Sequence, residues 1–304
     1  MVKLLAEPAP AKINLFLRVV GRRADGYHEL DSVFIPVSLY DQVRVEIRVE
    51  PGSASDTVIA LLCDRDDIPA GDKNLAWRAA DAFLREFGAT IHRPRHVGIH
   101  LRKEIPMGAG LGGGSSDAGT VLRMMAALCR VDDAPRLARV ALELGADVPF
   151  FLSPRVAHVS GVGEHIAPLE GTAPGERTRL SQVPLWMVIA VPPVEVSTAE
   201  IFRALSPEQR SGAAPIEHLH AIASGRITPS MLQNDLAAAA MARYPEIAEL
   251  QSALVAAGAA GASMSGSGGA VFGIFPDAAA AAEGAAKARQ RAPQARYYVA
   301  NSLS

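Results

Sequence analysis

Apolar residues recur at every second position in several stretches of the first hundred residues. In KINLFLRV, residues 12–19, apolar side chains alternate with side chains that are mostly polar. This period of two is typical of a strand with one buried face. Turn residues follow at Asp25-Gly26 and, after the second such stretch, at Pro51-Gly52. The pattern predicts four strands, at residues 12–19, 43–49, 57–63 and 97–101.

A period of three to four residues predicts helices between and after these strands. Helices ended by a glycine are predicted at 74–87 and 134–144. Between them, the apolar residues of 118–129 recur at helical spacing. Ser115 or Ser116 is the candidate N-cap of this middle helix, because a serine hydroxyl can accept a hydrogen bond from a free backbone N–H group.

The second half of the chain has a different order of elements. Residues 171–184 are polar and rich in Gly and Pro, so they are the candidate linker. The strands beyond it are expected at 185–191, 262–265, 270–275 and 296–301, and the helices at 199–205, 216–223, 230–242, 245–257 and 277–290. Without the middle helices this is the split β-α-β-β-α-β pattern of a ferredoxin-like unit. We therefore predict an α+β protein of two domains, 1–170 and 171–304.

The composition excludes several classes of protein. The chain has 304 residues, of which 49% are hydrophobic, and its 30 Lys and Arg nearly balance its 32 Asp and Glu. This balance is typical of a globular protein and predicts neither nucleic-acid nor membrane binding. The first residues lack the apolar segment of a signal peptide, and no apolar run approaches the ~20 residues of a membrane span, so we expect a cytoplasmic location. Cys63 and Cys129 lack metal-ligand spacing and are expected in the core.

Six glycines lie within the fourteen residues of PMGAGLGGGSSDAG, 106–119. Glycine is costly in conformational entropy, so such a run indicates positive φ angles or the close approach of another group. The loop leads into a predicted helix, and the free N–H groups of a helix N-terminus bind anions, phosphate above all. The alternative is a flexible turn between a strand and a helix.

Other glycine-rich motifs fit this loop less well. GAGLGG, 108–113, matches the dinucleotide-binding pattern, and Asp132 or Asp133 lies near the expected ~20 residues downstream. Against this assignment, the preceding strand alternates polar and apolar residues, and no flanking strand-helix-strand unit is present. A P-loop is excluded because no Gly-Lys-Ser or Gly-Lys-Thr ends the loop, and the protein-kinase motifs His-Arg-Asp and Asp-Phe-Gly are absent.

Three stretches resemble the motifs of the GHMP small-molecule kinases, in the order of that family. PAKINLFLRV at 10–19 resembles the first motif, 106–116 the second and SGSGGAVFGIF at 265–275 the third. Gly269 departs from the pattern, since family members more often carry a small side chain there. The resemblance implies a two-domain GHMP kinase fold, with a ribosomal S5 domain 2-like N-terminal half and a ferredoxin-like C-terminal half.

Within that family, GRRADGYHEL at 21–30 and LGADVPFF at 144–151 resemble the members that phosphorylate a cytidine diphosphate-linked sugar alcohol, CDP-linked methylerythritol. The resemblance implies ATP as donor and Mg²⁺ to bridge its oxygens. The serine that contacts phosphate or Mg²⁺, Ser115 or Ser116, stays open, and the metal ligands are unknown. The residues that the resemblance assigns to ATP are Pro106, Met107, Gly108, Ala109, Gly110, Leu111, Gly112, Gly113, Gly114, Ser115 and Ser116.

The resemblance also assigns the catalytic residues. It places the general base at Asp147, although from the residues alone an Asp ahead of Pro149 is more often a turn former. It places Lys12 beside this aspartate, where its charge could orient the carboxylate and stabilise the transition state. Lys12 and Asn14 share one face of a predicted strand, and the alternative for both is an ordinary solvated face.

The substrate residues come from three places in the sequence. An aromatic ring and an imidazole, Tyr27 and His28, can stack on a base and bond its edge, whereas the alternative for both is an exposed hairpin tip. The resemblance assigns them to cytosine, with Phe202 as the second stacking ring and Thr198 nearby. The glycine-rich loop of the third motif, residues 266–269, is implied to close on the phosphates and the sugar alcohol of the substrate. The alternative is that this loop is only a tight hairpin between two strands. The substrate residues are Asn14, Tyr27, His28, Thr198, Phe202, Gly266, Ser267 and Gly268.

We therefore expect an ATP-dependent kinase that acts on a small molecule by direct in-line transfer, as a monomer or weak homodimer. Another GHMP kinase, acting on mevalonate, homoserine or a sugar, would keep both glycine-rich loops but has no need of the Tyr27-His28 pair. A non-catalytic binding module or a dinucleotide enzyme is the alternative from a different class. Either of these would tolerate the loss of the Asp147 carboxylate.

Overall fold

The computed structural model describes residues 1–50, 56–170 and 178–303. The predicted turn at Pro51-Gly52 and residues 171–177 of the predicted linker lie outside these ranges. The chain forms two compact units that alternate along the sequence. Unit 1 consists of Met1–Ala11, Tyr40–Ile105 and Gly112–Pro154, and unit 2 of Lys12–Leu39, Pro106–Leu111 and Arg155–Ser304. The domain boundary expected between 170 and 171 falls next to residues outside the described ranges and stays a prediction.

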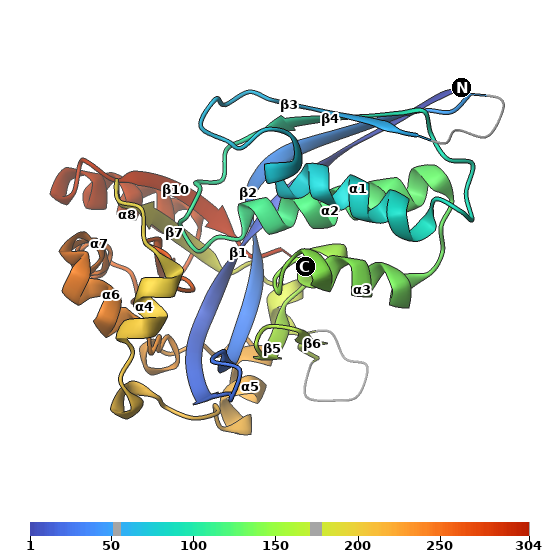
Figure 1. Ribbon diagram of the computed structural model, residues 1–304. Helices are drawn as coiled ribbons and strands as arrows, with labels where there is room; N and C mark the ends of the chain where they lie inside the picture. The colour runs from blue at the N-terminus through green and yellow to red at the C-terminus, as the bar shows by residue number, and fades with distance from the viewer. Residues whose placement is uncertain (51–55, 171–177, 304) are drawn as a thin grey trace. The chain divides into compact units, whose positions relative to one another are not determined.

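Two long strands, β1 (Val2–Arg22) and β2 (His28–Arg48), pair with each other and run through both units. In unit 1 the second half of β2 pairs antiparallel with β4 (His96–Arg102), which pairs parallel with β3 (Val58–Cys63). The helices α1 (Leu75–Phe87) and α2 (Gly113–Cys129) pack side by side, with α3 (Ala134–Leu144) against both (Figure 1). The alternating apolar residues of the predicted strands form the core with these helices.

Unit 2 contains a short antiparallel ladder on the first half of β2. Residues Leu30–Phe34 pair with β5 (Ala157–Gly161), which pairs with β6 (His165–Pro168). Neither β5 nor β6 was among the predicted strands. They are only five and four residues long, and neither has a clear alternation of apolar and polar side chains, so their pairing depends on β2 and on each other and not on a local hydrophobic pattern.

The rest of unit 2 contains an antiparallel sheet of β7 (Trp186–Val191), β8 (Gly261–Met264), β9 (Val271–Phe275) and β10 (Arg296–Asn301), in the order β10-β7-β9-β8. The helices α7 (Pro245–Ala256) and α8 (Ala278–Arg291) pack on it. This order confirms the ferredoxin-like prediction. The small residues of α8 permit the close approach, because a Cβ at Gly284 would lie 2.3 Å from the Phe275 ring.

Of the predicted middle helices, α4 (Thr198–Ala204) and α5 (Ile216–Ala223) are present, but α6 (Ala237–Arg243) is shorter than the predicted 230–242. The reason is a tertiary contact. Leu17 N donates to Gln233 O at 2.9 Å and Asp235 N donates to Leu17 O at 2.9 Å, so this segment lies extended along β1. Short 3-10 helices occur at Gly71–Lys73, Pro149–Leu152, Arg179–Ser181, Pro207–Gln209 and Pro229–Met231.

The predicted start of α2 is wrong. The helix begins at Gly113, and its N-cap is Gly112 with a φ of 73° and no side-chain cap, so neither Ser115 nor Ser116 is the N-cap. The helix begins with glycines because a larger residue would not fit there. A Cβ at Gly113 would lie only 2.9 Å from Ile105 Cγ2. No helix within the described ranges is both long and apolar enough to cross a membrane.

Candidate active site

Lys12 and Asn14 are buried, with exposed fractions of 4% and 3%, so the alternative of a solvated strand face is wrong. The Lys12 ammonium donates to Asn14 Oδ1 at 2.6 Å and to Gly110 O at 3.0 Å, and it lies 4.8 Å from the centroid of the Phe34 ring. Buried charges are costly unless they are paired or hydrogen-bonded. The contacts therefore hold a desolvated cation against the second glycine-rich loop.

Asn14 connects β1 to the third glycine-rich loop as well. Its backbone N–H donates to Ser265 Oγ at 3.1 Å, and that hydroxyl donates to Gly110 O at 3.1 Å. Its side-chain amide donates to Ser32 Oγ at 2.9 Å. The first, second and third motifs of the sequence thus meet around one buried hydrogen-bond network in unit 2.

The two glycine-rich loops are in direct contact, and this contact explains two of their glycines. A Cβ at Gly110 would lie 2.2 Å from Ser265 O, and one at Gly268 would lie 2.3 Å from Gly110 N. Ala270 N also donates to Ala109 O at 3.1 Å. Glycine is required at these two positions by the packing of one loop on the other.

Replacing Gly268 by alanine is therefore expected to destabilise the protein by about 1–3 kcal/mol, the usual cost of overpacking. The added methyl would lie within 2.4 Å of two backbone atoms, which cannot rotate away. Urea denaturation of the variant and the parent measures the difference. Gly98→Ala is the matched control, because the nearest atom to its new methyl is 3.7 Å away. Equal stability of Gly268→Ala and the parent would contradict the packing argument.

In the second glycine-rich loop, residues 106–114, some residues are exposed to solvent and others are buried. Gly108, Gly110 and Gly112 have φ angles of 64°, 76° and 73°, which confirms the expected positive φ. Met107, Gly108 and Gly114 are exposed, whereas Pro106, Ala109 and Leu111 are buried. The accessible backbone leads into the first turn of α2, whose initial N–H groups have no acceptor within the helix.

The two serines at this helix start differ in burial. Ser116 is fully buried, and its hydroxyl has no hydrogen-bond partner among the described residues, while Ser115 is half-buried. Of the two, Ser115 is therefore the more accessible. In unit 1, the first N–H groups of α2 and the more accessible Ser115 have the features of an anion site.

The four side chains expected around a base come together in unit 2. Tyr27, His28, Thr198 and Phe202 line a cavity of about 470 Å³. The rings of His28 and Phe202 are stacked, with centroids 5.2 Å apart and an interplanar angle of 27°. Thr198 Oγ1 lies 2.8 Å from Ser267 Oγ, which joins this cavity to the third glycine-rich loop. Such a cavity suits a flat aromatic ligand with a polar edge.

Three arginines that the sequence did not indicate line the same cavity, Arg22, Arg203 and Arg210. Burial lowers the pKa of His28, and the positive charges of Arg210 and Arg22 lower it further. The imidazole is therefore neutral at physiological pH and can both donate and accept a hydrogen bond. Arg22 is the last residue of β1 and lies within the stretch GRRADGYHEL, whereas nothing in the polar segment around Arg210 could have identified that residue.

Asp147 belongs to unit 1 and lies in the turn between α3 and the 3-10 helix Pro149–Leu152. It is partly buried, and Phe150 and Phe151 after it are buried. Phe151 packs on α2 at a glycine, since a Cβ at Gly119 would lie 2.6 Å from Phe151 Cβ. The apolar residues after Asp147 therefore attach its turn to the helix that starts at the glycine-rich loop.

A buried ion cluster, which the sequence also did not indicate, lies beside the first turn of α2. Lys103 Nζ donates to both Asp41 Oδ2 and Asp117 Oδ2, and all three side chains are at most 4% exposed. Asp41 Oδ1 accepts from the N–H groups of Glu104 and Ile105 at 2.7 and 2.9 Å. Burial raises the pKa of Asp117 to about 7, although Lys103 opposes the shift. The cluster joins Asp41 within β2 and Lys103, the residue after β4, to α2.

The cysteines are less buried than expected. Cys63 and Cys129 are partly buried and pack against the core of unit 1. Burial raises the pKa of the Cys129 thiol to about 11 and also raises that of Cys63. Neither thiol is therefore an activated nucleophile. Within the described ranges, no three or more His, Cys, Asp or Glu side chains are grouped so that they could hold a metal ion.

Comparison with known proteins places these features in one family. The model of the GHMP kinases N terminal domain matches residues 74–155, and that of the GHMP kinases C terminal matches 219–294. The chain is 44% identical over 285 residues to the 4-diphosphocytidyl-2-C-methyl-D-erythritol kinase of Anaeromyxobacter sp. strain K, covering 93% of this chain and 84% of that protein. It is 39% identical over 293 residues to the kinase of the same name from Geobacter sulfurreducens, covering 95% and 96%.

Solved structures agree with this result. A crystal structure of 4-(cytidine 5'-diphospho)-2C-methyl-D-erythritol kinase is similar with a TM-score of 0.79 and 38% identity, covering 99% of this chain and 100% of that one. The homoserine kinase of Cytophaga hutchinsonii is similar with a TM-score of 0.69, covering 99% and 94%, but at 18% identity it shows the fold alone.

Proposed function

Because the chain belongs to the 4-diphosphocytidyl-2-C-methyl-D-erythritol kinase family of GHMP kinases, we propose that it phosphorylates 4-diphosphocytidyl-2-C-methyl-D-erythritol. The reaction transfers the γ-phosphoryl group of ATP to the 2-hydroxyl group of the sugar alcohol. It is a step of the non-mevalonate route to isoprenoid precursors. A cytoplasmic location and a monomeric or weakly dimeric state stay predictions.

One observation carries this proposal. The stacked His28 and Phe202 line a cavity that Thr198 joins to Ser267 of the third loop, and that loop packs on the second loop beside Lys12. The sugar alcohol of a cytidylyl substrate whose base lies in the cavity would thus be directed along the third loop. A kinase for mevalonate, homoserine or a sugar has no base to recognise, so this arrangement supports the cytidylyl substrate.

Phosphoryl transfer needs mainly positioning and charge stabilisation from the protein. The accessible amides from Gly108 to Ser115 would donate to the oxygens of ATP. Asp147 would accept the proton of the 2-hydroxyl as the oxygen–phosphorus bond forms and the bond between the γ-phosphorus and the bridging oxygen breaks, which releases ADP. Lys12 would stabilise negative charge on the acceptor oxygen and the γ-phosphoryl group. The roles of Asp147 and Lys12 rest on the sequence resemblance.

The oxygen atoms available at the start of α2 fit a Mg²⁺ ion that is bound mainly by the phosphates of the nucleotide. Mg²⁺ is usually bound by one or two protein oxygens together with substrate phosphates and water, so it does not need a cluster of carboxylates. The half-buried Ser115 hydroxyl at the start of α2 is a suitable oxygen. When bound, the ion would neutralise part of the charge of the triphosphate.

An assay of the purified protein with ATP tests the proposal. We expect kcat/KM for 4-diphosphocytidyl-2-C-methyl-D-erythritol to exceed that for mevalonate, homoserine or galactose by at least a hundredfold, because only the first fills the base cavity. The formation of ADP is measured for each alcohol at the same ATP concentration. Faster turnover of any of the other alcohols would assign the chain to a different reaction.

A further inference from the structure

The cavity around His28 and Phe202 carries an unusual excess of positive charge. Its twelve lining residues include Arg22, Arg203 and Arg210 and not one Asp or Glu. The chain as a whole has a formal net charge of −2. Within the described ranges, none of these three arginines forms an ion pair with a carboxylate. A concave surface lined by several positive charges favours an anionic ligand.

Arg210 differs from the other two arginines in having an unused donor. Arg22 Nε donates to Gly26 O at 3.3 Å, and Arg203 Nε donates to Ala199 O at 3.1 Å. The Nε–H of Arg210 is shielded from solvent and has no hydrogen-bond partner among the described residues. A buried donor without an acceptor is costly. Because this atom is out of reach of solvent, a ligand in the cavity would contact the terminal nitrogens of the Arg210 guanidinium group, which is half-buried and lines the cavity.

The segment that carries Arg210 is held at two points by buried carboxylates. Asp235, 6% exposed, accepts from Ser211 N at 2.9 Å and from Ser211 Oγ at 2.6 Å. Asp31, 4% exposed, accepts from Ala214 N through one oxygen. The position of Arg210 is therefore set before a ligand binds, which reduces the entropy cost of recognition.

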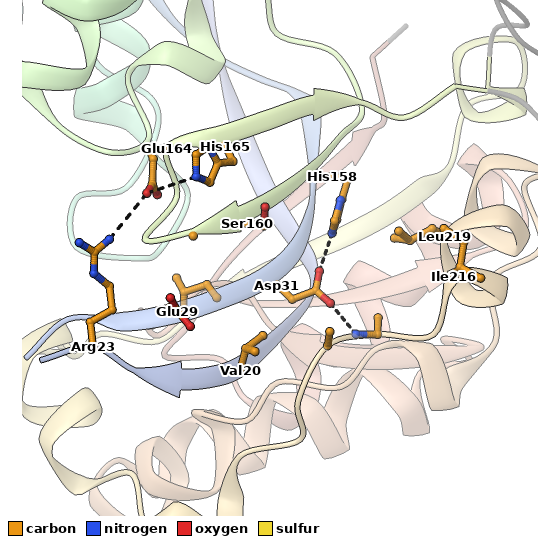
Figure 2. Close-up of a pocket in the computed structure, with 14 residues that line it drawn as sticks. Val20, Arg23, Glu29, Asp31, His158, Ser160, Glu164, His165, Ile216 and Leu219 are labelled. Carbon is orange, nitrogen blue, oxygen red and sulfur yellow. Dashed lines mark hydrogen bonds and ion pairs between the residues drawn. The ribbon is translucent and has the colours of Figure 1, made fainter.

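Asp31 is itself held by β5, on the side of a second cavity of about 520 Å³ (Figure 2). Figure 2 shows its carboxylate facing His158, whose Nε2 lies 2.6 Å from Asp31 Oδ1. Burial disfavours the ionised form of Asp31, but the hydrogen bonds with His158 and Ala214 N together lower its pKa below the ordinary value. The carboxylate thus stays ionised and keeps its hold on the segment at neutral pH.

We propose that Arg210 binds a phosphate group of the cytidine nucleotide whose base stacks in this cavity, and thereby selects nucleotides over nucleosides. This inference rests on the proposed function and names a specificity residue for it. A guanidinium group presents several donors in a planar fork that matches two phosphate oxygens. The positive charge of Arg22 and Arg203 at the same cavity adds attraction for the second phosphate of a diphosphate.

Calorimetric titration with cytidine 5'-diphosphate and with cytidine tests the role of Arg210. The parent protein is expected to bind the diphosphate at least tenfold more tightly than the nucleoside. Arg210→Gln should weaken diphosphate binding by about ten- to hundredfold, the range for a charge-assisted hydrogen bond, and change cytidine binding by less than about twofold. Arg210→Lys keeps the positive charge but loses the planar pair of donors. Its affinity for the diphosphate should lie between those of the parent and of Arg210→Gln.

Arg226→Gln is the matched control, because this arginine is exposed in unit 2 and does not line the cavity. It should bind both ligands as the parent does. Equal weakening of both ligands by Arg210→Gln would overturn the inference, since Arg210 would then contact the base or ribose. Equal affinity of the parent for both ligands would also overturn it. If the parent phosphorylates the cytidylyl substrate while either result holds, the proposed function stands and only the role of Arg210 fails.

Discussion

Replacing Asp147 by asparagine is expected to lower kcat at least a hundredfold, and as much as about ten-thousandfold, while the affinity for ATP changes by less than about tenfold. An amide cannot accept the proton of the acceptor hydroxyl, and a general base acts mainly on the chemical step. The substitution keeps the size of the side chain. The turn itself is attached to α2 through Phe151, which packs at Gly119, so the loop and the helix start should keep their structure.

Single-turnover kinetics with the cytidylyl substrate, together with titration of an ATP analogue, separate the chemical step from binding. Asp132→Asn is a suitable control, because it removes the same charge from an exposed position of unit 1. It should keep kcat within about twofold of the parent. If Asp147→Asn kept more than a tenth of the parental turnover, Asp147 would not be the base.

Replacing Lys103 by methionine is expected to lower the free energy of unfolding by about 3–5 kcal/mol, the usual cost of removing one partner of a buried ion pair. Lys103 is the cation between Asp41 and Asp117, and both carboxylates are buried. Without it, two carboxylates would face each other in a medium of low polarity. The end of β4 would also lose its attachment to α2, the helix that starts at the glycine-rich loop.

Urea denaturation measures this loss, and two further variants control it. Lys73→Met removes a charge from an exposed lysine and should change stability by less than about 0.5 kcal/mol. Adding Asp117→Asn to Lys103→Met should recover part of the loss, because one of the two unpaired carboxylates is then removed. If the double variant were no more stable than Lys103→Met alone, the loss would come from packing and not from charge.

Local patterns in the sequence determined most of the helices and strands. The helices Leu75–Phe87 and Ala134–Leu144 lie where they were predicted, because the side chains of Asn74 and Asp133 cap their first turns and a glycine follows each of them. The strands of the ferredoxin-like part were also predicted, within one or two residues of their bounds. Such signals lie within a few residues of each other, so they can be identified without a structure.

The errors occur where a distant segment decides the local conformation. The helix predicted at 230–242 begins only at Ala237, because backbone groups of Leu17 hold the residues before it in an extended form. The start of α2 at Gly113 depends on packing against Ile105, which outweighs the low helix propensity of glycine. The short strands β5 and β6 form because they pair with β2 and with each other.

The same distinction applies to the candidate site. The sequence by itself determined its chemistry, since the order of three motifs and the Tyr27-His28 pair indicate a GHMP kinase with a base to recognise. Only the tertiary structure decided that Lys12 is buried against Gly110, that Gly268 packs on the second loop, and that Arg210 faces the base cavity. The partners in these contacts are far apart along the chain, 98 residues in the case of Lys12 and Gly110. Burial and pairing of this kind depend on how the chain folds back on itself, and no periodicity within one segment encodes them.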